Sequence, residues 1–379
     1  MFGNLTEIIN LLMKSCNFFK VIVPLIMWIQ VMVSCLPEGE YRAQINFQPL
    51  EANDGWVIAD APGEGFNPAE LQAVYDMMFS DDRFITSRSL LIVKNGKLVS
   101  ESYFRDAGDR EKKNSIRGIT KCFTSVLMGF AWDEDIFELN NKLYNFIPGH
   151  FDGNRDKREI TLDNVLTMRT GLAWDDDMDT RELFNINRYP SSMRIVLTRK
   201  LVNPAGSWFS CNYGTPQLAM GVLRESFEIS CTDSLVSELF KSLDIDDFIW
   251  EKHADGLHFG GSGLHLKPRD LARFGLFCLR KGNWNGRQIV SEEWMEMSTS
   301  WLFDADIEEL PMGYGYYWWT DPEYNAFFGT GAGGQYLYIV PSLDLVIVHT
   351  ANPSVGFGYK GIKPSDFLMV AGKIIFALE

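Results

Sequence analysis

The order of hydrophobic patterns along the chain predicts an α/β protein of the α+β type, with an antiparallel sheet flanked by helices and a helical region inserted between its strands. Strand-like alternation occurs at residues 90–103, helical spacing dominates residues 118–257, and strand-like segments return near the C-terminus. Strands at both ends of a mostly helical stretch are expected to meet in one sheet. The 379 residues suit one large domain or two closely joined ones.

A helix and a β-hairpin are predicted at the start of the sheet region. The run Asn67-Pro68-Ala69-Glu70 supplies a helix cap, a first-turn proline and a glutamate at the third helical position, so a helix is expected over residues 67–79. Residues 90–93 and 98–103 alternate as strands around Asn95-Gly96, the preferred two-residue hairpin turn.

The remaining elements follow from the same patterns. Further helices are expected at residues 162–168, 191–201, 215–225 and 232–242. Strands are expected at residues 313–319, 336–340 and 345–350, with a closing helix at 364–377. The chain thus divides into a sheet region, about 60–115 and 258–379, and a helical region, about 116–257.

The stretch from Ser115 to Trp132 is expected to be the central helix. Its apolar residues recur at steps of three and four: Ile119, Phe123, Val126, Leu127 and Phe130. Lys121 interrupts this apolar pattern, and a buried lysine needs a polar partner. Gly118 lies one turn before Lys121, where most residues would stabilise a helix better.

This stretch resembles the Ser-x-x-Lys motif of serine hydrolases related to class C β-lactamases and penicillin-binding proteins. Arg117-Gly118-Ile119-Thr120-Lys121-Cys122 matches it except that Gly118 stands at the position of the nucleophilic serine. The resemblance extends from about residue 89 to the C-terminus, through segments 160–174, 260–275, 313–319 and 329–341. It implies a β-lactamase-like fold and acyl transfer from amide, ester or β-lactam bonds through an acyl-enzyme.

A second motif, Phe209-Ser210-Cys211-Asn212-Tyr213-Gly214, is similar to the family pattern Phe-x-Tyr-Asn-x-Gly. The family tyrosine, which shares proton transfer with the lysine, falls on Cys211. Asn212 matches the asparagine whose amide helps to hold the substrate and the lysine. A bulge would be needed to bring the phenol of Tyr213 to the place of the lost tyrosine.

A third motif, Gly329-Thr330-Gly331-Ala332, occupies the place of the family's Lys-Thr-Gly edge strand. The resemblance implies that the N–H of Ala332 joins that of residue 118 in an oxyanion hole. Residues 329–334 also spell Gly-x-Gly-x-x-Gly, but a strand follows them. A dinucleotide site requires a helix there.

Composition excludes several other classes of function. The net charge of −15 argues against a nucleic-acid partner. Outside residues 1–35 the cysteines are Cys122, Cys211, Cys231 and Cys278; none lies in Cys-x-x-Cys or near a histidine at ligand spacing, so no metal is expected. No cofactor is expected either.

Residues 1–35 are predicted to be a targeting segment. Lys14 and Lys20 precede an apolar run at residues 21–33 that is short for a membrane span. Its end resembles a bacterial lipoprotein signal with Cys35 as the lipidated first residue; an uncleaved anchor or an ordinary signal peptide is the alternative. Residues 36–379 would then form a domain held to the membrane in the cell envelope.

Three hypotheses remain open from the sequence. The first is a family fold without its chemistry, serving as an envelope binding protein for a small-molecule, peptide or peptidoglycan-like ligand. The second is an active hydrolase in which Cys211, or less plausibly Cys122, attacks in place of serine. The third is an ordinary serine hydrolase in which Gly118 is an engineered substitution or a sequence error.

Overall fold

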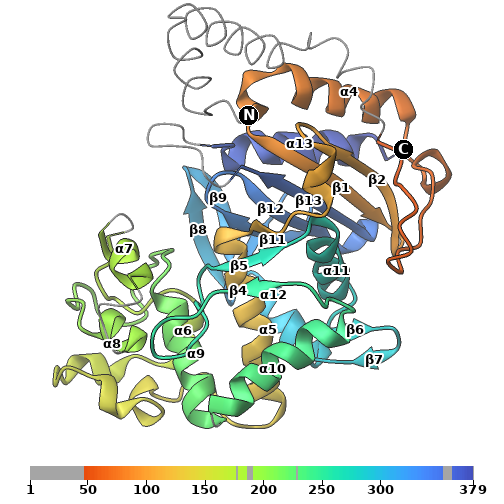
Figure 1. The fold of residues 1–379 in the computed structure, drawn as a ribbon. Coiled ribbons are helices and arrows are strands. Elements are labelled where there is room, and N and C mark those ends of the chain that lie inside the picture. The colour runs from red at the N-terminus through yellow and green to blue at the C-terminus, as the bar shows by residue number, and fades with distance from the viewer. Residues whose placement is uncertain (1–46, 176–177, 186–190, 228, 353–360, 379) are drawn as a thin grey trace, which may run out of the picture. The chain divides into compact units, whose positions relative to one another are not determined.

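A single antiparallel sheet with strand order β2-β1-β13-β12-β11-β10-β9-β8 organises the structure (Figure 1). Its strands are β1 (Ser87–Lys94), β2 (Lys97–Tyr103), β8 (Phe303–Ile307), β9 (Leu310–Tyr314), β10 (Trp319–Asp321), β11 (Ala326–Gly331), β12 (Gln335–Val340) and β13 (Leu345–Ala351). Early strand β1 pairs with late strand β13, Leu90 opposite His349. The prediction that both ends of the chain build one antiparallel sheet is confirmed.

The computed structural model describes residues 47–175, 178–185, 191–227, 229–352 and 361–378. Two small sheets accompany the main one. They are formed by β3 (Asn114–Ser115), β5 (Leu264–Leu266) and β4 (Ile249–Trp250), and by β6 (Asn283–Trp284) and β7 (Arg287–Gln288).

Helices cover the sheet and fill the region between its early and late strands. Among the described residues, the α-helices are α4 (Pro68–Ser80), α5 (Thr120–Asp133), α6 (Leu162–Leu166), α7 (Met178–Phe184), α8 (Ser192–Leu197), α9 (Thr215–Ser226), α10 (Ile229–Ser242), α11 (Pro268–Leu279), α12 (Glu292–Thr299) and α13 (Pro364–Phe376). One-turn 3₁₀ helices are η1 (Pro62–Glu64), η2 (Asp82–Phe84), η3 (Ala107–Arg110), η4 (Arg117–Ile119), η5 (Leu143–Asn145), η6 (Pro148–His150), η7 (Asp156–Glu159) and η8 (Pro341–Leu343).

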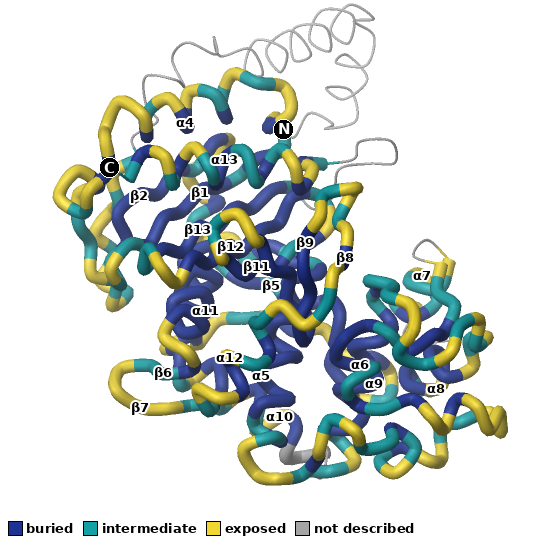
Figure 2. The backbone as a smooth tube through the Cα atoms, turned by 180° about the vertical axis from the view of Figure 1, so that it is seen from behind, coloured by how far each residue is buried: buried dark blue, intermediate teal, exposed yellow. Residues whose placement is uncertain are grey.

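Successive residues of β12 show how the two faces of the sheet are covered. Tyr336 stacks on Phe367 of α13, with ring centroids 4.1 Å apart. Leu337 points to the opposite face, as strand geometry requires, and packs against Gly275 of α11, where a Cβ would lie 2.7 Å from it. Helix α4 lies beside α13 (Figure 1). The strands between these layers are buried (Figure 2).

The first helix and the hairpin form as their local signals predict. The Asn67 side chain accepts hydrogen bonds from the backbone N–H groups of Ala69 and Glu70, at 3.0 and 3.3 Å. Helix α4 therefore starts at Pro68. Asn95 and Gly96, with φ of +53° and +74°, make the tight turn between β1 and β2.

The prediction of a single strand at residues 313–319 is wrong. Strand β9 ends at Tyr314 and β10 begins at Trp319, and these two residues pair with each other across a turn. Tyr317 has a φ of +68° in that turn. Its left-handed backbone depends on packing, and neither the aromatic side chain nor the alternation reveals it.

The description of residues 329–331 as part of an edge strand also needs correction. They belong to β11, which lies inside the sheet between β12 and β10. Its pairing with β12 runs to Gly331, whereas its pairing with β10 stops at Phe328. The last three residues of β11 therefore have no partner strand on the β10 side.

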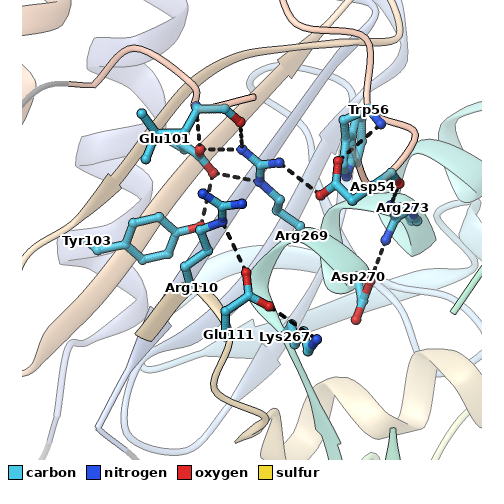
Figure 3. A network of polar contacts seen from close by, with 11 residues as sticks. Asp54, Trp56, Glu101, Tyr103, Arg110, Glu111, Lys267, Arg269, Asp270 and Arg273 are labelled. Atoms are coloured by element: carbon cyan, nitrogen blue, oxygen red, sulfur yellow. Dashed lines mark hydrogen bonds and ion pairs between the residues drawn. The ribbon is translucent and has the colours of Figure 1, made fainter. Parts of the chain in front are cut away.

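A buried ion-pair network ties residues 47–56 to the sheet (Figure 3). Arg269 of α11 contacts both carboxylate oxygens of Glu101 on β2, and its Nη1 lies 2.8 Å from Asp54 Oδ2. Arg269 is 4% and Glu101 2% exposed. Removing one partner would leave a buried charge uncompensated, so the network fixes where this segment crosses the surface.

The predicted signal segment, residues 1–35 with Cys35, lies outside the described residues. Among the residues that are described, none of the helices is both long and apolar enough to cross a bilayer.

Candidate functional site

Strand β3 delivers the chain to the start of the central helix α5. The Ile116 N–H donates to Leu264 O at 2.9 Å, which continues the β3–β5 pairing. Arg117 then takes a φ of +51°, and one turn of 3₁₀ helix, η4, leads into α5. Helix α5 is buried along most of its length (Figure 2). Its buried residues include the polar Thr120 and Lys121 as well as the apolar ones.

The end of β11 packs against η4 with main chain against main chain. A Cβ added to Gly118 would lie 2.5 Å from Thr330 O and 3.5 Å from Gly331 Cα. A Cβ added to Gly331 would lie 2.4 Å from Ile116 O and 3.0 Å from Gly118 N. Contacts near 2.5 Å are far inside van der Waals distance, so this arrangement requires glycine at both positions and has no space for a side chain at residue 118.

Lys121 meets the second motif in the same place. Its Nζ donates a hydrogen bond to Cys211 Sγ at 3.4 Å and lies 5.3 Å from the centre of the Tyr213 ring. Lys121 is 6% exposed, whereas Cys211 is half-buried. The expected polar partner of the buried lysine is therefore Cys211, and the Tyr213 ring faces the ammonium group.

The surroundings of Lys121 favour its charged form. Burial acts to lower the pKa of Lys121, but the neighbouring Cys211 and Tyr213 groups outweigh it, so the pKa lies above its ordinary value. Lys121 is then an ammonium group at neutral pH. In that form it donates protons and cannot take one from a nucleophile.

Asn212 lies next to Cys211, but its amide faces the start of α9. Its Oδ1 accepts the N–H groups of Gly214 and Thr215 at 2.9 and 2.7 Å, and its Nδ2 donates to Ser210 O at 2.7 Å. These contacts cap the helix. The contact with Lys121 that the resemblance implied is not among its hydrogen bonds to the described residues.

A buried histidine, His349, binds the main chain of the turn after β11. His349 Nδ1–H donates to Gly334 O at 2.7 Å, and the Ser87 hydroxyl donates to His349 Nε2 at 3.0 Å. Burial lowers the pKa of His349 to about 4, although the bond to Gly334 opposes this. Sequence reasoning gave His349 no role. Ala332, expected to supply an oxyanion N–H, is exposed in this turn.

The other possible thiol nucleophile is enclosed. Cys122 is 1% exposed, its Sγ is 3.6 Å from Tyr317 O, and burial raises the pKa of the thiol above its ordinary value. No cluster of three or more metal-binding side chains occurs among the residues that the structure describes. The expectation of no metal rests on the sequence.

Comparisons with known proteins agree with this architecture. The sequence model of the Beta-lactamase family matches residues 78–360. A 6-aminohexanoate-dimer hydrolase of Paenarthrobacter ureafaciens is 24% identical over 288 residues, which cover 69% of this chain and 72% of that protein. It is similar in sequence to this chain.

Solved structures show the same fold at low identity. A Bacillus anthracis protein described as a 6-aminohexanoate-dimer hydrolase has a TM-score of 0.68 at 19% identity, covering 88% of this chain and 89% of its own. A penicillin-binding protein homologue from Caulobacter crescentus has a TM-score of 0.65 at 14%, covering 84% and 99%. A class C β-lactamase mutant has 0.61 at 16%, covering 82% and 98%. The chain belongs to the beta-lactamase family of hydrolases, which cleave amide and ester bonds through an acyl-enzyme.

Proposed function

We propose that this chain keeps the ligand-binding architecture of the family but forms no acyl-enzyme at residue 118. The observation that carries the proposal is the approach of Thr330 O to Gly118, which leaves no space for a nucleophilic side chain. Glycine itself supplies no oxygen to attack a carbonyl. In this proposal Lys121, Cys211 and Asn212 belong to a binding surface and take no part in acyl transfer.

The electrostatics near Gly118 support the same proposal. An oxyanion hole presents N–H groups to a developing negative charge, whereas here a carbonyl oxygen, that of Thr330, faces residue 118. Lys121 is held as an ammonium group by Cys211 and Tyr213. A protonated lysine cannot activate a hydroxyl group, so serine acylation would lack its base as well as its nucleophile.

The ligand proposed is an amide- or ester-containing small molecule or peptide, including a peptidoglycan-like peptide. Its support is by similarity, from relatives named as a 6-aminohexanoate-dimer hydrolase, a penicillin-binding protein homologue and a family VIII carboxylesterase. The place of action proposed is the bacterial envelope, with a lipid anchor at Cys35. The basic and apolar pattern of residues 1–35 motivates that part.

Hydrolysis assays test the loss of chemistry. The purified protein is mixed with a chromogenic cephalosporin, a p-nitrophenyl ester and a D-alanyl peptide, and product is followed from the first seconds. We expect no burst and no turnover above the buffer rate. Turnover that survives thiol alkylation would overturn the proposal.

A second function is favoured by one specific contact, the 3.4 Å separation of Cys211 Sγ and Lys121 Nζ. A Cys211 thiolate could attack the ester carbonyl and expel the alkoxide, which takes a proton from the Lys121 ammonium. Water would then attack the thioester while the neutral Lys121 takes a proton from it, which releases the acid and regenerates the Cys211 thiolate and the Lys121 ammonium. Iodoacetamide should abolish such turnover, as should Cys211→Ala. Cys122→Ala is the matched control, because the buried Cys122 should be dispensable.

The location is tested by fractionation. In the bacterial host, the protein should be found with the membranes, and Cys35→Ala should release it into the soluble fraction. Membrane association that persists in Cys35→Ala would instead support an uncleaved anchor.

A further inference from the structure

A cleft of about 780 Å³ opens beside the segment that leads into α5. Ser115 and Arg117 form part of its lining, whereas Gly118, Lys121 and Cys211 do not. Its size is that of a small-molecule site, which in proteins is roughly 300–1,000 Å³. The cleft is therefore a neighbour of the family site, with a lining of its own.

The lining is basic in an acidic protein. The chain carries 50 acidic and 35 basic residues, yet five cations line the cleft with a single carboxylate, that of Glu251. The five cations are Arg88, Lys112, Lys113, Arg117 and Lys252. The charge balance of the cleft is thus opposite to that of the chain as a whole.

Carboxylates that are not part of the lining pair with three of these cations. Arg88 pairs with the fully buried Asp109 at 2.6 Å, Lys252 pairs with Asp233 at 2.7 Å, and Lys113 pairs with Asp247. None of these three carboxylates lines the cleft. The lining itself thus presents five cations and one carboxylate to a ligand.

Lys112 is the most available of these charges. Its side chain is 55% exposed, and its Nζ lies 4.0 Å from Asp109, at the limit of an ion pair. A charge in that state loses little hydration when an anion approaches it. Lys113, the next residue in the chain, also lines the cleft.

Part of the lining is apolar. Phe184 and Phe259 contact each other with ring centroids 4.7 Å apart, and both line the cleft. Behind them, Leu183 and Ile195 complete a small apolar cluster separate from the main core. A ligand with an apolar body and an anionic end would satisfy both walls at once.

We propose that this basic cleft binds the carboxylate end of an amphipathic small molecule, with the cations at the carboxylate and the phenylalanine pair against the hydrocarbon. Arginine and lysine donate charge-assisted hydrogen bonds to carboxylates, and arginine does so with two parallel donors. The proposal stands on the lining alone. It holds whether or not the chain forms an acyl-enzyme.

Calorimetry with three probes of equal length tests the proposal on the full chain. Hexanoate is expected to bind in the millimolar range or tighter, hexanol at least about tenfold more weakly, and hexylammonium not detectably. Raising the salt concentration should weaken hexanoate more than hexanol. Equal binding of the three probes, or no heat from hexanoate at about 10 mM, would overturn the proposal.

Charge-neutralising variants locate the site. Lys112→Gln combined with Lys113→Gln should weaken hexanoate about tenfold and leave hexanol unchanged. The matched control, Lys241→Gln with Lys373→Gln, removes two exposed lysines from α10 and α13 and should change neither. Arg117→Gln is a second, independent variant with the same expectation. Unchanged hexanoate affinity in folded Lys112/Lys113 and Arg117 variants would refute the assignment.

Discussion

Five consecutive residues, 114–118, take part in two regions of opposite character. On one side Gly118 packs main chain to main chain against β11, with no space for a single methyl group. On the other side Asn114, Ser115 and Arg117 line an open, basic cleft. The family's chemistry would need space on the first side, and the space lies on the second. Glycine at residue 118 thus coincides with a main chain packed too closely for any side chain there.

The largest change in stability is expected at Gly118, where the main chain packs against β11. Gly118→Ala should lower the free energy of unfolding by about 3 kcal/mol, because the new Cβ must displace Thr330 O or distort η4. Gly118→Ser should cost as much and should not restore acylation. Chemical denaturation measures the free energy of unfolding of both variants.

Gly149→Ala is the matched control for this prediction. Gly149 also lies in a 3₁₀ turn, but nothing lies within 4 Å of an added Cβ. Its stability should change little. If Gly118→Ala were as stable as Gly149→Ala, the main chain of β11 could move away from residue 118 at little cost in free energy.

The stability of the protein should depend on pH through His349, whose side chain binds the turn after β11. The pKa of His349 is about 4 in the folded protein and near 6.5 when unfolded, so the unfolded chain binds the extra proton first as pH falls. Its stability contribution is complete above pH 6.5 and is lost towards pH 4. At pH 5 the loss is about 2 kcal/mol relative to pH 7.

Denaturation at pH 5 and pH 7 for wild type and His349→Gln isolates this effect from other titrating groups. The variant should show the smaller difference between the two pH values, even if it is less stable overall. Equal differences would show that His349 is not the group responsible.

A substitution at Lys121 tests whether this residue contributes to stability. Lys121→Met replaces a buried ammonium group, which has no ion pair among the described residues, by an apolar side chain of similar length. Stability should stay the same or rise by about 1 kcal/mol. A fall of several kcal/mol would show that the contact with Cys211 is a major stabilising one.

Substitutions in the basic cleft should give the smallest change in stability. Lys112→Gln with Lys113→Gln should alter the free energy of unfolding by about 0.5 kcal/mol or less, because the ion pairs of these lysines are partly exposed. The same variant should still bind hexanoate about tenfold more weakly. A large destabilisation would make the cleft wall a structural element instead.

The sequence predicted those features whose signals are local. Asn67 capped its helix, and Asn95-Gly96 turned its hairpin, because each acts on neighbouring backbone. The pairing of early and late strands followed from their order. Lys121 was recognised as needing a polar partner, but the contact with Cys211 joins residues 90 positions apart.

What could not be predicted depends on packing between distant segments. The resemblance aligned Ala332 with an oxyanion donor, and that role stays a prediction; the close approach of Thr330 O to Gly118 joins segments more than 200 residues apart and had no signal in the sequence. Tyr317 turns the chain in a left-handed conformation that only its surroundings require. The basic cleft draws cations from separate segments, and the nearby pair Lys112-Lys113 was its one visible signal.

The most direct test of the account is intact-protein mass spectrometry after prolonged incubation with a β-lactam, an activated ester and a fluorophosphonate. Each reagent leaves a covalent adduct on a working serine hydrolase of this family. The account predicts an unmodified mass in all three samples, for the wild type and for Gly118→Ser alike. A stoichiometric adduct that survives in Cys211→Ala would contradict it.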